Sequence, residues 1–307
     1  MSAVPDSVLA RMGANGTGSF TEKLIRVTFI LASKGATFPG TQSNKLVIQG
    51  LRTASKITTV NRQSTLAALS VWGMRMEDMN ALTVAWSAPG SLTLNNSLIV
   101  EAGTKDKFSE VFRGTLFEAQ PNYEGAPEVT FDAQAMGGYF AAIEVHPDNS
   151  WQGSVTIIEM VRKILQGTDF TVVDGGAKGT LSNPKFTGSR WQQMQTACES
   201  TNTDWYVVGK DIVLCPFNKP KTEVPALVLS PATGLIGYPR LERAGLVVKS
   251  LFDPALLCGT PIEIRNSIVP YVNGKWFPQK VEHMLEANLP NGRWMSESYC
   301  LPVESLT

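Results

Sequence analysis

The side chains in this sequence that are most able to bind a metal or take part in catalysis are the cysteines and histidines, and they are few. Four cysteines lie in the second half of the chain: Cys198, Cys215, Cys258 and Cys300. No two of them form a Cys-x-x-Cys or Cys-x-x-x-x-Cys pair, so their spacing argues against a zinc site of the usual kind. We therefore expect buried free thiols and no metal-binding residues.

The two histidines, His146 and His283, fall in different parts of the chain. His283 alternates in step with Val281 and Leu285, which predicts a core or interface histidine on the apolar face of a strand. His146 precedes a proline near an expected domain boundary, where an exposed loop is the default. Neither histidine lies in a recognisable motif with a cysteine or serine partner. The sequence therefore gives little support for histidine-based catalysis.

Glycine-rich and acidic segments supply no catalytic motif either. Residues 174–180 read DGGAKGT, which lacks the order of a phosphate-binding loop and opens no helix. Glu77 and Asp78 begin a predicted helix, where the helix dipole explains them. Four other acids are expected on wet or partner-facing strand faces: Glu110, Glu118, Glu128 and Asp132. We predict no enzyme activity, no catalytic residues and no cofactor.

Seven tryptophans raise the alternative of a carbohydrate- or cell-surface-binding module, because sugars stack on exposed rings. The sequence pattern assigns three of them to cores: Trp72, Trp191 and Trp205. The alternative therefore requires that the other four be exposed together: Trp86, Trp151, Trp276 and Trp294. Because basic residues do not cluster beside these rings, core packing is the favoured interpretation.

Composition limits the class of protein. The 307 residues contain 27 basic and 27 acidic side chains and 43% apolar residues, enough for real cores in about two or three domains. A balanced charge argues against a strong basic field for nucleic acid. No apolar run approaches the ~18 residues of a membrane span, and the first residues lack a secretory apolar region. We expect a soluble protein folded in a cytoplasm.

The first part of the chain reads as strands. Period-two alternation and turn residues predict strands at 24–31, 45–49, 65–72, 97–102, 108–119 and 127–135. A short helix is expected over Met76–Leu82, after Gly73 ends a strand. The alternation implies one buried face and one wet or partner-facing face on each strand.

The middle of the chain mixes helix and strand. Ser154 is expected to cap a helix that stops at Gly167, and Ser189 with Gln192 forms a capping box for a second helix. Residues 205–214 predict a hairpin with a type II′ turn at its centre. These elements indicate a small α/β module.

After a proline-rich connector the chain returns to β. Strands are expected at 245–251, 261–266, 276–285 and 294–301, with hairpin turns at Asn273-Gly274 and Asn291-Gly292. This pattern suggests a compact antiparallel barrel. The predicted plan is a flexible arm over 1–19, then a β-barrel domain (20–150), an α/β domain (151–222) and a second β-barrel domain (223–307).

Two stretches resemble a known family. Residues 69–83, LSVWGMRMEDMNALT, are similar to a segment of the baseplate hub proteins of tailed bacteriophages. Residues 245–259, GLVVKSLFDPALLCG, continue that similarity, followed by an IEI strand, a GKW segment, His283 and the closing NGRW at 291–294. The matching stretches cover about a third of the chain, and their motifs are structural rather than chemical.

The resemblance implies a homotrimer at the distal end of the tail tube. Each subunit of such hubs carries two antiparallel barrels related to the tail-tube fold, so three subunits present a pseudo-six-fold ring. The implied partners are further copies of the chain, the tail tube protein, a central spike or tail-tip protein and the tape measure protein. DNA would pass through the lumen without specific binding, which favours a neutral or acidic lining. The implied location is the virion tail, assembled in the host cytoplasm.

The resemblance also marks architectural residues. The positions that match the family pattern are Trp72, Gly73, Asn80, Leu82, Asp253, Pro254, Gly259, His283 and Trp294. They are expected to support assembly rather than a reaction. A tail-associated hydrolase is a third hypothesis, and it lacks the acid/base pair that it would need.

Overall fold

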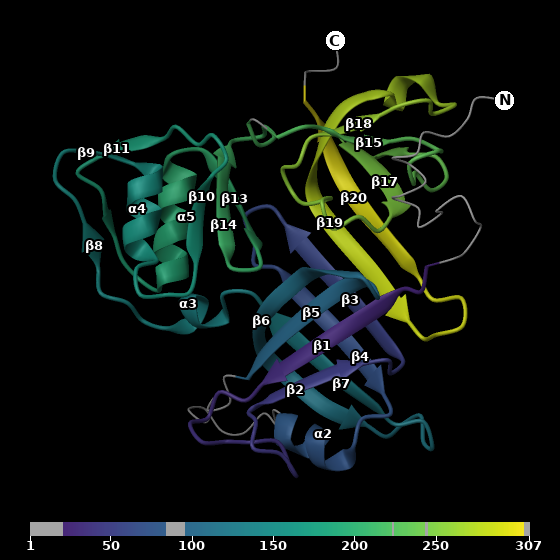
Figure 1. Cartoon of the computed structure of the whole chain (residues 1–307). Helices are drawn as coiled ribbons and strands as arrows, with labels where there is room; N and C mark the ends of the chain where they lie inside the picture. Colours follow the sequence, from purple (N-terminus) through teal and green to yellow (C-terminus); the bar gives the residue numbers. More distant parts are fainter. Residues whose placement is uncertain (1–20, 84–95, 223, 243–244, 304–307) are drawn as a thin grey trace.

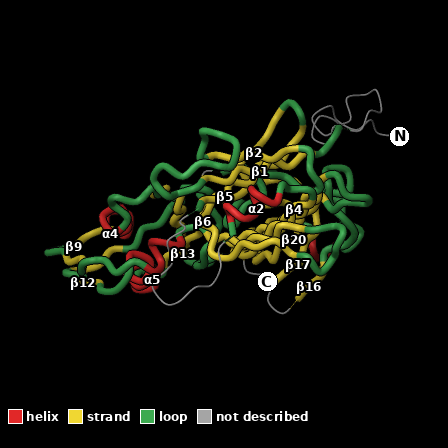
Figure 2. The backbone as a smooth tube through the Cα atoms, turned by 90° about the horizontal axis from the view of Figure 1, so that it is seen from below, coloured by secondary structure: helices red, strands yellow, loops and turns green. Residues whose placement is uncertain are grey.

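The computed structural model describes residues 21–83, 96–222, 224–242 and 245–303. The protein is mainly β, with a large antiparallel sheet and few helices, as the sequence predicted. The main sheet has thirteen strands, and three smaller sheets accompany it. Figure 2 shows the helices α4 and α5 at one end of an elongated molecule, with the main sheet at the other. The expected arm over 1–19 lies outside the described residues.

Seven strands of the main sheet come from the first part of the chain. They are β1 (Leu24–Ile30), β2 (Lys45–Gln49), β3 (Thr53–Val60), β4 (Leu66–Trp72), β5 (Ser97–Thr104), β6 (Lys107–Asn122) and β7 (Thr130–Met136). They lie in the order β3-β4-β7-β6-β5-β1-β2, all antiparallel. In Figure 1 this part of the sheet folds over so that β1 crosses β3 and β4. Strand β3 has no counterpart among the predicted strands.

The first core lies between the two layers of this folded sheet. Alternate residues of β1, β4 and β7 point inward, and the rings of Phe29 and Phe131 pack edge to face with centroids 5.8 Å apart. Helix α2 (Met76–Leu82) forms over the predicted range and adds Leu82 to this core. Gly73 turns the chain from β4 toward this helix with a φ of 83°, a conformation that glycine adopts without strain.

The α/β module comprises three helices and seven short strands. They are α3 (Tyr139–Ile143), β8 (Asn149–Ser150), β9 (Ser154–Thr156), α4 (Ile157–Ile164), β10 (Thr171–Asp174), β11 (Thr180–Ser182), β12 (Lys185–Phe186), α5 (Arg190–Ser200), β13 (Thr203–Val208) and β14 (Asp211–Pro216). Helices α4 and α5 pack on the sheet β10-β14-β13 around a second core (Figure 1). The β13–β14 hairpin is confirmed, and its Gly209 has the positive φ, 59°, that a II′ turn requires.

Of the two helix N-caps predicted in this module, one is confirmed and one is wrong. The predicted capping box of Ser189 and Gln192 is confirmed. The predicted cap at Ser154 is wrong, because Ser154 belongs to strand β9 and Thr156 caps α4 instead. Thr156 forms its own capping box with Glu159, since the glutamate three residues on can reach back to the backbone N–H of the cap.

The last part of the chain adds six strands to the main sheet. They are β15 (Leu227–Leu229), β16 (Arg240–Glu242), β17 (Gly245–Leu251), β18 (Ile262–Ile264), β19 (Gly274–Ala287) and β20 (Trp294–Pro302), with a short 3₁₀ helix, η1 (Pro270–Val272). The predicted hairpin turn at Asn273-Gly274 is wrong. The Asn273 side chain instead hydrogen-bonds the backbone of Ser267, closing a longer loop between β18 and β19. The Asn291-Gly292 pair does lie in the connection of the β19–β20 hairpin.

One strand pair joins the two β regions. Strands β19 and β3 pair antiparallel over eight residue pairs, from Lys280 with Val60 to Ala287 with Thr53. The main sheet therefore runs without a break from β16 to β2 (Figure 1). The far end of β19 also adds Leu285 and Ala287 to the first core, whereas its Trp276 and Val281 belong to a third core beneath β17 and β20.

Candidate functional site

One side of the main sheet faces away from the cores and continues across both β regions. We call this surface the outer face. It is formed by β17, β20, β19 from Lys280 onward, β3, β4, β7 and the second half of β6. In β4 the residues Ala67, Leu69 and Val71 are buried in the core, while Ala68 and Ser70 between them face outward. The same alternation holds in β7.

Strand register aligns the outer-face side chains in rows across the strands. One row consists of Lys249, Glu297, Glu282, Thr58, Leu66 and Met136. The next row consists of Met295, Met284, Lys56, Ala68, Gln134 and Glu118. Residues from the two ends of the chain therefore share one surface.

The cations of this surface are paired with carboxylates. Lys249 lies 3.1 Å from Glu297, and Lys56 and Lys280 both contact Glu282. Two further ion pairs lie on this surface, Arg293 with Glu286 and Arg52 with Glu128. Such exposed pairs contribute little to stability, but they cancel the positive potential locally.

Two carboxylates on the surface have hydrogen bonds but no cationic partner among the described residues. Glu118 accepts a hydrogen bond from the Gln134 amide at 2.8 Å. Asp132 accepts from the Ser70 hydroxyl at 2.7 Å and from the Asn122 amide at 3.0 Å. The outer face is thus neutral to slightly acidic. The prediction that Glu118 and Asp132 lie on strand faces opposite the core is confirmed.

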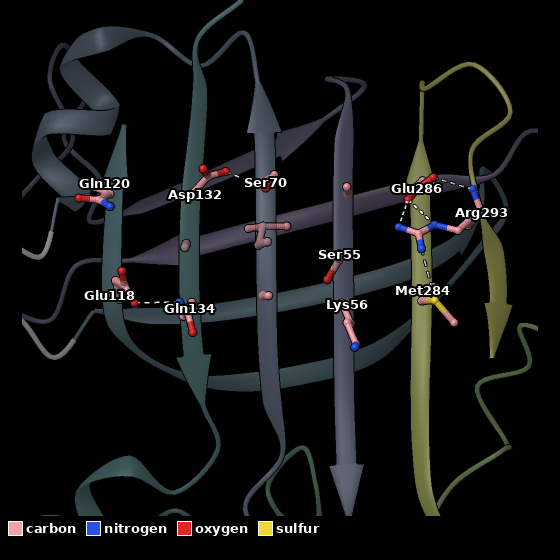
Figure 3. A pocket seen from close by; sticks show the side chains of 14 residues that line it. Ser55, Lys56, Ser70, Glu118, Gln120, Asp132, Gln134, Met284, Glu286 and Arg293 are labelled. Carbon is pink, nitrogen blue, oxygen red and sulfur yellow. Dashed lines mark hydrogen bonds and ion pairs between the residues drawn. The ribbon is translucent and has the colours of Figure 1, made fainter. Parts of the chain in front are cut away.

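The outer face is hollowed where β3, β4, β6, β7 and β19 lie side by side, as Figure 3 shows. The hollow has a volume of about 340 Å³ and is lined by Ala68 and Ser70 of β4 among others, with Glu118 and Arg293 toward opposite sides. The hydrogen bonds from Arg293 outweigh partial burial and hold the pKa of Glu286 below its usual value. The charged groups are therefore held in ion pairs, which suits a contact surface more than proton transfer.

The first group of architectural residues forms one corner. Trp72 ends β4 half-buried, Gly73 makes the turn, and Leu82 is fully buried, whereas Asn80 is exposed on α2. The half-buried state of Trp72 corrects its assignment to the core, because the side chain points to the outer side of the strand, alternate to Val71.

The second group is gathered around Phe252. The Phe252 ring packs edge to face on both His283 and Trp294, with centroids 5.2 and 5.6 Å away. Asp253 accepts a hydrogen bond from the Ala255 backbone N–H and so fixes the turn that contains Pro254.

Gly259 lies apart from that group. It has a φ of 71°, and an added Cβ atom there would lie 2.7 Å from the Tyr206 hydroxyl oxygen. A side chain at this position would therefore combine backbone strain with a steric clash. The close approach places the loop after β17 directly against the α/β module.

The predictions for the histidines have different outcomes. His283 is buried, as predicted, and a 2.7 Å hydrogen bond joins its Nδ1 to the Ser296 hydroxyl. Burial lowers the pKa of His283 to about 4, so the ring is neutral near pH 7. His146 lies in a loop but is half-buried, which corrects the expectation of an exposed side chain.

The four cysteines are free and buried, as predicted. Burial raises the pKa of Cys198 and Cys300 to about 12, so these thiols are unreactive near neutral pH. Within the described residues, no group of three or more His, Cys, Asp or Glu side chains is arranged to bind a metal ion. In the same part of the chain no helix is long and apolar enough to span a membrane.

The six tryptophans within the described residues do not form an exposed group. Trp191 and Trp205 are buried, as predicted. Trp276 is only 2% exposed, and its indole N–H donates to the backbone carbonyl of Val272. Trp86 lies outside the described residues. The requirement that Trp86, Trp151, Trp276 and Trp294 be exposed together is therefore not met, which weighs against the carbohydrate-binding alternative.

The fold is similar to that of solved phage tail proteins and of a type VI secretion system component. Three solved structures illustrate it, each with a TM-score of 0.61. The 43 kDa tail protein of prophage MuSo2 from Shewanella oneidensis is 8% identical, with 91% of this chain and 97% of that chain covered. The tail protein from Neisseria meningitidis MC58 is also 8% identical, with 90% and 96% covered. The E. coli c3393 protein, a type VI secretion system component, is 9% identical, with 90% and 77% covered.

The family follows from the sequence itself. A model of the baseplate hub gp41 family matches residues 24–289. The chain belongs to this family, and the resemblance to phage baseplate hubs is confirmed. No curated protein matches the sequence. Because the structural neighbours share so little sequence, they establish the fold alone.

Proposed function

We propose that the chain is the structural hub of a phage tail baseplate or tail tip. It acts as a homotrimer that joins the hexameric tail tube to the central spike or tip protein, and it has no catalytic activity. Its location is the virion, with assembly in the host cytoplasm. The observation that carries the proposal is the outer face, a charge-balanced sheet surface that continues through both β regions.

Symmetry supports this arrangement. Each copy has two β regions joined edge to edge through β19 and β3, so three copies supply six β regions around one axis. Heterologous contacts of this kind close into rings. A trimer can therefore match a six-fold tube above it and a three-fold spike below it. We propose the domains 20–150, 151–222 and 223–307 as the units of this ring, with α3 and β8 at the end of the first domain packed into the α/β module.

The outer face is the surface we assign to the channel. A channel for the tape measure protein and DNA must not retain phosphate groups, and unpaired lysine or arginine side chains would do so. On the outer face the cations are paired within the surface, and Glu118 and Asp132 add unpaired negative charge. DNA is therefore expected to pass without specific binding.

The architectural residues serve assembly in this proposal. Trp72, Gly73, Asn80 and Leu82 shape the corner between β4 and α2, where the tube-facing part of the first β region would form. The second set fixes the loop after β17 and the β19–β20 hairpin: Asp253, Pro254, Gly259, His283 and Trp294.

Light scattering and electron microscopy of the purified chain test the assembly. We expect a mass of three subunits, alone or after addition of the tail tube or spike protein, and ring images with three-fold or pseudo-six-fold symmetry. A chain that stays monomeric at every concentration and with both partners would overturn the proposal.

Added positive charge tests the channel assignment. The triple variant Ala54→Lys, Thr58→Lys, Ala68→Lys places unpaired cations in the middle of the outer face. In a phage complemented with this variant, we expect normal particles but an infectious titre at least tenfold lower, because DNA passage is retarded.

A matched control carries the same added charge on exposed positions of the α/β module. The control is Gln152→Lys, Gln166→Lys, Thr196→Lys, and it should keep the wild-type titre. Equal titres for the two triple variants, with equal particle numbers, would place the channel on another surface.

A further inference from the structure

The joint between β19 and β3 shows how one β region of this fold accepts another. The strands meet through backbone hydrogen bonds, edge to edge, so the sheet and its outer face continue across the joint. In a head-to-tail ring the same chain must present two more edges, one at each end of the outer face. Both edges can be found in the strand register.

The first edge is the second half of β6. Strand β6 pairs with β5 up to Thr115 and with β7 from Thr115 onward. Residues 117–122 therefore have a partner strand on one side only among the described strands. Pro121 lies within this segment and lacks a backbone N–H, so a strand added at this edge pairs through the backbone groups of the other residues of 117–122.

The second edge is β16, at the opposite end of the sheet order. Strand β16 pairs with β17 on one side and with no other strand in the described part of the chain. All three of its residues are exposed. Tyr238, just before it, is 67% exposed, and Leu241 within it is 48% exposed. Large exposed apolar side chains beside an open edge are typical of an interaction surface.

The two edges are complementary. Beside the β6 edge, exposed Tyr123 and Met76 contact each other, with the tyrosine hydroxyl 2.9 Å from the thioether sulfur. This edge presents Glu118, which has no cationic partner among the described residues, whereas the β16 edge presents Arg240, 71% exposed and 3.7 Å from Glu242 in the same strand. So long and exposed an ion pair is weak, which leaves the guanidinium group able to bind a second carboxylate. Apolar side chains thus face apolar side chains, and a carboxylate faces a guanidinium group.

We propose that the occupant of each edge is a second copy of this chain. The β16 edge of one copy pairs with the 117–122 edge of the next, and the outer face continues from copy to copy. This inference rests on the homotrimer of the proposed function and assigns its contact. Two unlike edges can close a ring, whereas a pairing of like edges would stop at a dimer.

Disulfide cross-linking tests the assignment. Arg240→Cys is combined in turn with Glu118→Cys, Gln120→Cys or Asn122→Cys, which all project from the outer face as Arg240 does. A disulfide requires Cα atoms about 4.4–6.8 Å apart, so one of the three pairs should cross-link fastest and report the register. The four native cysteines are buried, which keeps the background low.

We expect oxidation of that double variant to give covalent dimers and trimers on a denaturing gel. Each single variant should remain a monomer band, because unlike edges never bring two copies of one position together. The pair Arg240→Cys with Gln152→Cys, whose second position is exposed on the α/β module, should also remain monomeric.

The possible failures are distinguishable. Trimers in light scattering without cross-links from any of the three pairs would overturn this edge assignment and leave the proposed hub intact. Rapid cross-linking of a single variant would indicate a two-fold contact and also overturn the assignment. A chain that is monomeric under all conditions would overturn both proposals.

Discussion

Replacing Arg62 by alanine should lower the free energy of unfolding by about 2–3 kcal/mol. Arg62 lies in the turn between β3 and β4, and its Nε donates to Asp204 of the α/β module at 2.7 Å. The Asp204 side chain is only 5% exposed, so removal of its partner leaves a carboxylate buried without a cation. The Asn218 N–H still donates to Asp204, and Arg62 itself is partly exposed, which keeps the loss below that of a fully buried pair.

Urea unfolding of the purified protein measures this loss. Arg52→Ala is the matched control, because its ion pair with Glu128 is exposed on both sides and should cost less than about 1 kcal/mol. The double variant Arg62→Ala, Asp204→Asn should recover part of the loss, since no charge is then buried. Equal losses for Arg62→Ala and Arg52→Ala would show that the pair does not hold the module to the sheet.

Local elements were predictable where local chemistry determines them. Helix α2 and the β13–β14 hairpin follow from residues within one segment: a glycine that ends a strand, or a glycine at the first central position of a turn. The α4 cap at Thr156 had the same kind of signal, a glutamate three residues later. The choice of Ser154 failed because two candidate hydroxyl residues precede the same helix, and only one of them has that glutamate.

Strand β3 was missed because its core face is only partly apolar. Thr53, Ser55, Ile57 and Thr59 point inward, so hydroxyl groups replace most of the expected aliphatic side chains. The Thr59 hydroxyl is satisfied by the Thr65 hydroxyl at 3.2 Å, across the turn to β4. The Thr53 hydroxyl donates to the Leu51 carbonyl at 3.2 Å, whereas the buried Ser55 hydroxyl has no hydrogen-bond partner. Hydrogen bonds of this kind let hydroxyl residues occupy core positions of a strand without an apolar pattern.

The outer face could be predicted only in part. Alternation within single strands placed Glu118 and Asp132 opposite the core, and the structure agrees. The pairing of Lys56 with Glu282 depends on the register between β3 and β19, which are more than 200 positions apart in sequence. No local pattern contains this register, so the charge balance of the surface emerges only once the sheet is assembled.

Stability of the folded protein should fall as the pH drops from about 6.5 to about 4, because of His283. Burial lowers the pKa of His283 from its ordinary value of 6.5 to about 4. Above pH 6.5 the ring is neutral in both states and has no effect. Below that value the unfolded chain binds a proton that the folded chain excludes, so each pH unit costs about 1.4 kcal/mol, or about 3 kcal/mol in total.

The His283 contribution can be isolated by comparing pH profiles of urea unfolding. Glu282 and Glu286 also have lowered pKa values, so they destabilise the fold in acid below their ordinary 4.5, in wild type and variants alike. The variant His283→Gln, or His283→Phe if the first is too unstable, should therefore have a flatter profile between pH 6.5 and 4.5. A slope unchanged by both His283 variants would mean that the buried ring takes up its proton without unfolding, and that the packing of Phe252 and the hydrogen bond to Ser296 tolerate a charge.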